Sequence, residues 1–532
     1  MLSSYLWLSA LGPLALLSVA LFPAAENREA AAATSRRAVA AALVALLVAL
    51  LTAAMVARWG PMRTQVLGPN GIGLELYVDS LSVTMFCLVA FVGLIVVLYS
   101  RNYMDGDAGQ SRFTRLLCLT LVSVLFVIVS GNVLAFVLAW IATSLSLQQL
   151  LLFYPERPAA VLASRKKFIT SRLGDACLIV AMVLLYRLFG SLDYSVIFSA
   201  AQAFRGGDIP ATIDIVSVLF VCAALLKSAQ FPTHGWLIEV METPTPVSAL
   251  LHAGIVNAGG FLVLRFSNII SLSEPSLNVL AIVGGLTALF GSMVMLTQTS
   301  IKVTLAYSTV AQMGFMMLEC GLAAFPAALL HIVAHSLYKA HAFLSSGSVI
   351  DIARASWTRS PGGKPHPGRL VFAIVGVLAV AFGVSRVFGA SRTEQPGVFA
   401  LGAVLLLGLI HLVASGIDER PNVYVVGRVL LLAVVVGVAY FALQIAVERL
   451  LVGSLPPTQA LRGPLDLAIV AAVVLFFAVV TFVQGMLPTK NAAPGWQALY
   501  AHISNGFYVN TLFNRLLRAW PERSKKTAPS TI

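Results

Sequence analysis

The sequence predicts an all-α polytopic membrane protein of about 13 to 15 helices, one of them discontinuous, and three observations support this fold class. Hydrophobic residues make up 59% of the 532 positions, and charged residues only 11%, against roughly 25% charged in a soluble domain. Mean hydropathy is +0.90. Apolar runs of about 20 residues, each able to cross a hydrocarbon core of roughly 30 Å as a helix, recur along the chain. These features exclude a soluble protein.

The helices are predicted from apolar runs that end at charges or at Pro and Gly clusters. The first run, Leu2–Phe22, could be a signal peptide, but it has no basic n-region and a second run follows soon, so we expect a retained helix. The predicted helices lie near residues 2–22, 38–57, 78–99, 113–129, 132–153, 168–188, 213–228, 247–266, 276–298, 301–319, 324–350, 370–389, 397–415, 425–446 and 466–486. After these, Trp496–Trp520 mixes aromatics with arginines, which suits a helix on the membrane surface.

The net charge of +13 would suggest a nucleic-acid partner in a soluble chain. Here the basic residues concentrate in alternate loops between the predicted helices, which indicates contact with membrane lipid and no nucleic acid. By the positive-inside rule the bias predicts an N-terminus outside and a C-terminus in the cytoplasm. The five cysteines are scattered singly in apolar stretches and predict packing residues.

The run that ends at Lys227 carries the first charge expected at membrane depth. Pro232 follows soon and cannot donate a backbone hydrogen bond, so the helix should break there, and Pro244 and Pro246 predict a second break. The segment between them, which contains Glu239, is therefore predicted to be discontinuous or re-entrant. A lysine at such a break can change its charge as a proton passes; the alternative is snorkelling to the membrane surface.

Two acidic residues begin otherwise apolar helices. Asp175 and Asp79 can each be N-terminal charges favoured by the helix dipole, or Asp175 can belong to a proton pathway.

Titratable residues recur along one later helix. His331, His335 and Lys339 are spaced by four residues and share a helical face. They favour a proton relay, with a satisfied core histidine and a zinc pair as alternatives, although no third zinc ligand is visible. His252 can join this relay to the Lys227 break, and Lys302 is either a connector or an interfacial lysine.

The chain offers no site for cofactor chemistry. It has no Gly-rich nucleotide motif after a strand and no metal-ligand cluster. We therefore expect an ion-translocating transporter subunit that is not itself an enzyme and holds no cofactor or metal.

Two motifs resemble a known family. They are Lys227-Ser-Ala-Gln-Phe-Pro-Thr-His-Gly-Trp236 and Met241-Glu-Thr-Pro-Thr-Pro-Val-Ser-Ala-Leu-Leu-His252. With Ile301–Thr309 and His331–Ile350, they are similar to the antiporter-like subunits of respiratory complex I, multisubunit cation/proton antiporters and membrane hydrogenases. The resemblance covers about residues 75–350, with a weaker match at Asn505–Asn510.

The resemblance implies roles for the polar residues. Lys227 would be the central proton-handling lysine, Lys302 a bridging lysine, and the His331 helix part of a polar axis. It implies four regions: N-terminal helices (1–110), a proton-translocating core (111–350), C-terminal helices (351–487), and a cytoplasmic surface helix with the tail (488–532).

The sequence departs from the family in two places. Ile141 follows Trp140 where complex I subunits carry a glutamate, so Asp175 or Glu239 would have to be the counter-charge of Lys227. The lysine motif of a second half-channel is absent, which leaves Arg386 and His411 as candidates there.

Within the superfamily, Thr233–Pro246 with His252–Gly260 looks most like the membrane subunit of DAB-type inorganic carbon transporters. That likeness implies location in the cell inner membrane and a large partner similar to a β-carbonic anhydrase, with zinc on that partner. The chain would conduct protons, or sodium, to drive uptake of CO2 or bicarbonate. The alternatives are a subunit of a complex I-like or hydrogenase oxidoreductase, and a component of a cation/proton antiporter.

Overall fold

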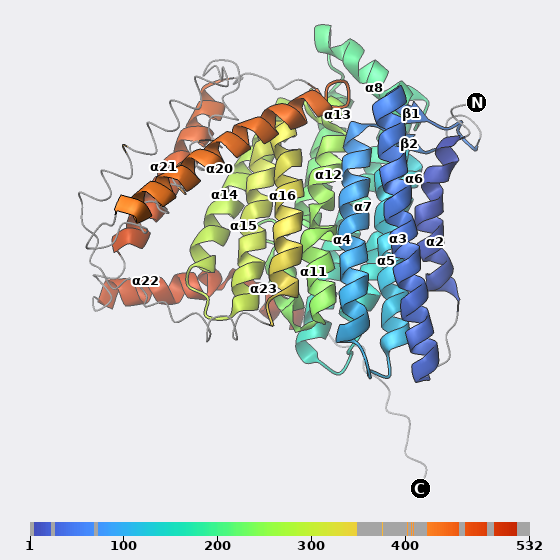
Figure 1. Cartoon of the computed structure of the whole chain (residues 1–532). Coiled ribbons are helices and arrows are strands. Elements are labelled where there is room, and N and C mark those ends of the chain that lie inside the picture. Colours follow the sequence, from blue (N-terminus) through green and yellow to red (C-terminus); the bar gives the residue numbers. More distant parts are fainter. Residues whose placement is uncertain are drawn as a thin grey trace.

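The chain forms a bundle of upright helices, as predicted (Figure 1). The computed structural model describes residues 5–22, 27–68, 73–347, 423–456, 463–486 and 494–518, with isolated helical residues between 375 and 408. Within this part, eight helices are long and apolar enough to span a membrane. The predicted helices at 370–389 and 397–415, with Arg386 and His411, lie outside the described residues.

The N-terminal helices pack closely through small side chains. The 3₁₀ helix η1 (Leu6–Ala10) continues into α2 (Leu11–Leu21), which packs against α3 (Arg28–Trp59). Ala38, Ala45 and Ala49 of α3 are almost fully buried. Small residues allow helix backbones to approach, which is the usual basis of packing in membranes.

A buried ion pair fixes the start of α4 (Ser80–Tyr103). Asp79 caps this helix by accepting a hydrogen bond from the Ser82 amide at 2.8 Å. Its carboxylate also accepts two bonds, at 3.0 and 3.1 Å, from Arg265. The helix-dipole explanation of Asp79 is therefore part of its role, and the ion pair to a distant helix is the other part.

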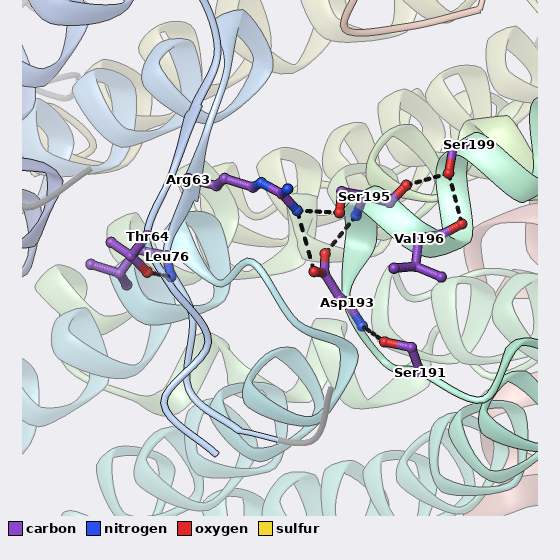
Figure 2. A network of polar contacts seen from close by, with 8 residues as sticks. All are labelled: Arg63, Thr64, Leu76, Ser191, Asp193, Ser195, Val196 and Ser199. Carbon is purple, nitrogen blue, oxygen red and sulfur yellow. Dashed lines mark hydrogen bonds and ion pairs between the residues drawn. The ribbon is translucent and has the colours of Figure 1, made fainter. Parts of the chain in front are cut away.

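A short hairpin, β1 (Met62–Arg63) and β2 (Tyr77–Val78), lies at the end of the bundle near the N-terminus. Figure 2 shows Arg63 reaching Asp193 at 3.3 Å and also contacting Ser195. Asp193 caps α8 (Tyr194–Ala203) through the Ser195 amide. The hairpin is thereby tied to α8, a short helix that the apolar runs did not predict.

The next helices are α5 (Gln110–Val129), α6 (Val133–Leu151) and α7 (Pro158–Phe189). The structure corrects the predicted start of α7 at residue 168. Lys166 and Lys167, taken as loop residues, lie inside the helix and are 1% exposed. Pro158 occupies the first turn, where its missing N–H costs nothing, so the helix begins ten residues earlier.

The discontinuous helix is confirmed. The segment consists of α9 (Ala211–Lys227), α10 (Gly235–Glu239), η3 (Val240–Glu242), α11 (Thr245–Ala253), η4 (Ile255–Asn257), α12 (Ala258–Arg265) and α13 (Ser267–Ile270). The predicted helix at 247–266 is therefore interrupted at Gly254, which the sequence did not predict. Beyond it, α14 (Glu274–Met295) packs along α15 (Ile301–Gly321), and α16 (Phe325–Leu344) follows.

The C-terminal helices lie differently from the others. Figure 1 shows α20 (Val423–Leu450) and α21 (Pro464–Met486) oblique at one side of the bundle, where they contact α16 and α14. The predicted surface segment forms α22 (Pro494–Ser504) and α23 (Val509–Arg518), separated by η6 (Gly506–Tyr508). These two helices run across the end of the bundle opposite the hairpin.

Candidate functional site

The break after α9 exposes backbone groups that other parts of the protein satisfy. The chain leaves the helix at Lys227, and Pro232 lies in the connection to α10. The Phe231 amide donates to Thr287 Oγ1 at 3.0 Å, and Ser228 Oγ donates to the Val256 carbonyl at 2.7 Å. Pro244 precedes the first residue of α11, and Pro246 lies in its first turn. Irregular backbone at this depth is thus enclosed by protein, as the bilayer requires.

Lys227 is buried, and its ammonium contacts two side chains of α6. Its side chain is 3% exposed. The Nζ atom donates to Ser144 Oγ at 2.9 Å and lies 4.4 Å from the centre of the Trp140 ring. An ammonium over an indole face gains a favourable cation–π interaction. In the described part of the chain, no carboxylate lies within 4 Å of this ammonium.

The two expected counter-charges pair with other residues. Asp175 Oδ2 lies 2.6 Å from Arg172 on the same helix, α7. Glu239 Oε1 lies 2.6 Å from Lys166 Nζ. Asp175 still exerts a favourable electrostatic interaction on Lys227, so it acts on the lysine without direct contact.

Lys167 is a buried cation that the sequence analysis placed in a loop. Its Nζ atom has no hydrogen-bond partner in the described part of the chain and lies 4.2 Å from the centre of the Trp236 ring. The same electrostatic cluster contains Lys227, Asp175 and Arg172. The sequence signal that could have identified it is Pro158, which marks the true helix start.

Four residues link α7, α10 and α23 through hydrogen bonds. We call them the entrance junction: Lys166, Glu239, Asn510 and Asn514. Lys166 Nζ donates to Glu239 Oε1 and to Asn510 Oδ1, each at 2.6 Å. The Asn510 and Asn514 amides donate to Glu239 Oε1 at 3.0 and 2.9 Å. Helix α23 therefore covers the buried Lys166.

A second group of polar residues lies between α11, α15 and α16. His252, fully buried, has its Nδ1 atom 2.9 Å from Thr309 Oγ1 and stacks on Phe343. Asn257 donates to Ser336 Oγ at 2.8 Å. Ser228, next to Lys227 in the chain, donates to the carbonyl of Val256, which precedes Asn257. The interruption at residues 254–257 therefore connects this group to the Lys227 break.

His331, His335 and Lys339 lie on α16, facing α15. Lys339 Nζ donates to the Leu305 carbonyl at 3.0 Å. The ring centres of His331 and His335 are 6.4 Å apart, and neither nitrogen of His335 has a hydrogen-bond partner among the residues that the structure describes. The described residues contain no cluster of three His, Cys, Asp or Glu side chains that could hold a metal.

His331 has two partners on α15. Its Nδ1 atom lies 3.0 Å from Glu319 Oε1, and its Nε2 atom lies 2.7 Å from Gln312 Oε1. Glu319 was not identified from the sequence. At the other end of α15, Lys302 Nζ donates to Thr245 Oγ1, the first residue of α11, at 3.3 Å.

These residues form a file along α15 and α16. Lys302 and Glu319 are 17 positions apart, which is about 25 Å at the rise of an α-helix. Between them, on α16, lie Lys339, His335 and His331, whose side chains can gain or lose a proton. Such groups are costly inside a membrane and mark ion pathways.

Family models match more than half of the chain. Residues 67–114 match the model described as NADH-ubiquinone oxidoreductase (complex I), chain 5 N-terminus. Residues 130–359 match the model described as NADH:quinone oxidoreductase/Mrp antiporter, transmembrane. The second match contains the whole discontinuous segment and the α15–α16 file.

Curated relatives extend the likeness to most of the chain. The probable inorganic carbon transporter subunit DabB2 of Halothiobacillus neapolitanus is 39% identical over 86% of this chain and 83% of its own length. The DabB subunit of Hydrogenovibrio crunogenus is 37% identical over 84% and 83%. Subunit 5 of the chloroplast NAD(P)H-quinone oxidoreductase of Glycine max is 37% identical over 55% of this chain and 40% of its own.

Solved structures share the fold. A chain of the Mrp complex from Dietzia matches with a TM-score of 0.58 and 23% identity, over 97% of this chain and 59% of that one. A chain of an archaeal membrane-bound sulfane sulfur reductase matches with a TM-score of 0.55 and 19% identity, over 96% and 99%. Both neighbours are parts of multisubunit membrane complexes.

Proposed function

Because this chain belongs to the antiporter-like family of cation-translocating membrane subunits, with inorganic carbon transporter subunits among its relatives, we propose that it is the ion-conducting subunit of an energy-coupled inorganic carbon uptake complex. The ion is a proton, with sodium as the alternative. The observation that carries the proposal is the buried ammonium of Lys227. It lies at a helix break and contacts a hydroxyl and an indole ring but, in the part of the chain that is described, no carboxylate.

An unpaired buried ammonium is poised to lose its proton. Removal of a charge from water is costly, and a carboxylate in contact would offset that cost and hold the proton. Asp175 and Glu239 are each engaged by another cation. Lys227 would therefore exchange protons with Lys167 and the entrance junction on one side and with the His252 group on the other.

The chemistry of carbon hydration belongs to a partner in this proposal. The driving force is the transmembrane potential, about 2.3 kcal/mol per charge per 100 mV. The partner would be a large zinc-containing subunit similar to a β-carbonic anhydrase, a DabA-type protein. The chain would lie in the inner membrane with its N-terminus outside, so that the entrance junction faces the cytoplasm; the distribution of basic loop residues supports this orientation.

Lys227 provides the decisive test. Lys227→Ala should abolish growth at low CO2 in a strain that depends on this transporter, while the complex still assembles. Lys227→Arg is the sharper variant, because a guanidinium keeps the charge but cannot release its proton. We expect it to be equally inactive. Growth equal to wild type with either variant would remove Lys227 from the mechanism.

The partner is tested separately. Purification of the tagged chain, followed by mass spectrometry, should recover a large zinc-containing protein in a stable ratio. Recovery of dehydrogenase or hydrogenase subunits would support the oxidoreductase alternative, which the 37% identity to a chloroplast oxidoreductase subunit favours. Sodium sensitivity of a deletion strain would support the antiporter alternative.

A further inference from the structure

Glu319 and its neighbours surround a cavity that the Lys227 mechanism does not use. The cavity measures about 300 Å³, whereas a single water needs about 10–15 Å³. It lies between α15, α16 and α20, and its polar lining consists of Gln312, Glu319, His331, Tyr440 and Gln444.

Three oxygen atoms of this lining are buried without a hydrogen-bond partner among the described residues. They are Glu319 Oε2, the Tyr440 hydroxyl and Gln444 Oε1. Glu319 is 5% exposed and Gln444 is 4% exposed. Buried polar atoms in native proteins are almost always paired with protein or with water. An open pocket of this size, with three such atoms in an otherwise mostly apolar lining, has room and polar partners for ordered water beside Glu319.

The other carboxylate oxygen, Glu319 Oε1, faces His331. The imidazole lies between Glu319 and Gln312, with contacts of 3.0 and 2.7 Å. When Gln312 presents its oxygen, Nε2 must carry a hydrogen, and the contact to Glu319 needs a second hydrogen shared between Nδ1 and Oε1. When the Gln312 amide turns its NH2 group to Nε2, one hydrogen on Nδ1 is sufficient. The triad thus keeps both hydrogen bonds whether it holds one proton or two.

We propose that the Glu319–His331–Gln312 triad is a proton-exchange site that connects the water of this cavity to His335 and the α15–α16 file. In the release step, the two-proton form loses the Nε2 proton of His331 by water to His335, as Gln312 turns its NH2 group to Nε2. In the loading step, a water chain in the cavity gives a proton to Glu319 Oε2. That proton then passes by water to Nε2 as Gln312 turns its oxygen back, which restores the two-proton form. Each transfer forms one bond to hydrogen and breaks one, so the charge is balanced.

The groups around Glu319 are consistent with a proton site. His331 faces it from α16 and Tyr440 from α20, while Cys320 is its neighbour in the chain. His335 lies one turn beyond His331 and interacts with that ring. Lys339 acts on His335. The packed helix α14 carries one charged residue, Glu274, exposed in its first turn. In the described part of the chain, therefore, no lysine or arginine lies within 4 Å of the Glu319 carboxylate, whereas Asp79 pairs with Arg265.

The test is carbodiimide labelling of the purified complex in detergent. Dicyclohexylcarbodiimide is apolar and reacts with buried carboxylic acids in their protonated form. Peptide mass spectrometry should find the adduct on Glu319, decreasing as the pH is raised. Asp79 is the internal control, because it is equally buried but bonded to Arg265, and it should remain unlabelled. Glu319→Gln should lose the adduct, and Tyr440→Phe with Gln444→Leu should slow its formation.

The outcomes separate this inference from the proposed function, on which it rests. Lys227→Ala should stop transport and leave Glu319 labelling unchanged. Absence of label on Glu319 at every pH would overturn the inference. Protection by sodium chloride, but not by choline chloride, would also overturn it and identify a sodium site. If Glu319→Gln fails to elute as a folded complex, the pH dependence of labelling in the wild-type protein still decides.

Discussion

Removal of the Asp79 carboxylate should destabilise the protein strongly, although it lies far from Lys227 in sequence. Asp79 and Arg265 are 1% and 2% exposed in their side chains. The pair is bidentate, and it joins the start of α4 to the end of α12. In Asp79→Asn the amide oxygen can still cap α4, whereas the charge that compensates Arg265 is lost.

The magnitude follows from this geometry. Loss of one partner of a buried ion pair costs about 3–5 kcal/mol, because the other charge stays buried without compensation. Asp79→Ala should cost a further 0.5–2 kcal/mol, roughly, for the lost helix cap. At about 1.4 kcal/mol per factor of ten, Asp79→Asn changes the folded-to-unfolded ratio by more than a hundredfold.

The assay is thermal denaturation in detergent, followed by size-exclusion chromatography of the remaining folded protein. Asp105→Asn is the matched control. Its pair with Arg28 spans 3.8 Å with side chains 61% and 84% exposed, so a change of about 0–1 kcal/mol is expected. Combining Asp79→Asn with Arg265→Leu should recover part of the loss, since no buried charge remains. A double variant less stable than Asp79→Asn alone would refute the reasoning, as would Asp79→Asn melting like wild type.

Two further predictions concern the two ends of the bundle. At the hairpin end, burial and, to a lesser degree, Asp193 raise the pKa of Glu75 to about 8 from 4.5, against an opposing effect of Arg63. Between these pH values the folded protein holds a proton that the unfolded chain has lost, so stability should fall as the pH rises through this window. Glu75→Gln should flatten that fall in a series of melting temperatures, and an unchanged slope would contradict the assignment. At the opposite end, Asn510→Ala with Asn514→Ala removes three of the hydrogen bonds of the entrance junction. This variant should make proteoliposomes leak protons, whereas Asn505→Ala, whose amide bonds only the local Ala501 carbonyl, should not; equal leak rates would show that α23 does not seal the junction.

The sequence predicted the helices well where hydropathy alone decides them. It also predicted the breaks around Pro232 and Pro244, because proline lacks an amide hydrogen and acts locally. The predicted start of α7 was wrong, because the charged residues Lys166 and Lys167 interrupt the apolar run from which the helix was predicted. What allows these lysines inside the bundle is the Trp236 ring and Glu239, about 70 positions away, and a local pattern contains no trace of such contacts.

In the candidate site, too, contacts between residues far apart in the chain could not be predicted from the sequence. The spacing of His331, His335 and Lys339 along one helix predicts that they share a face, and in the structure all three lie on α16. Glu319 stands out in the sequence as a single acid in the run Ile301–Gly321, but its significance depends on Tyr440, more than a hundred residues later. Whether Asp175 or Glu239 is the counter-charge of Lys227 depends on three-dimensional geometry: both carboxylates pair with other cations, and only Asp175 acts on Lys227, without contact.

The entrance junction has a consequence for how the protein is made. Lys166 and Glu239 leave the ribosome hundreds of residues before Asn510 and Asn514, which complete their hydrogen bonds. The nascent chain therefore inserts α7 and the discontinuous segment before the entrance junction can close, and closure waits for the last stretch of translation. If the chain conducts ions as proposed, a product truncated before Asn510 would leave the junction open and would dissipate the membrane potential.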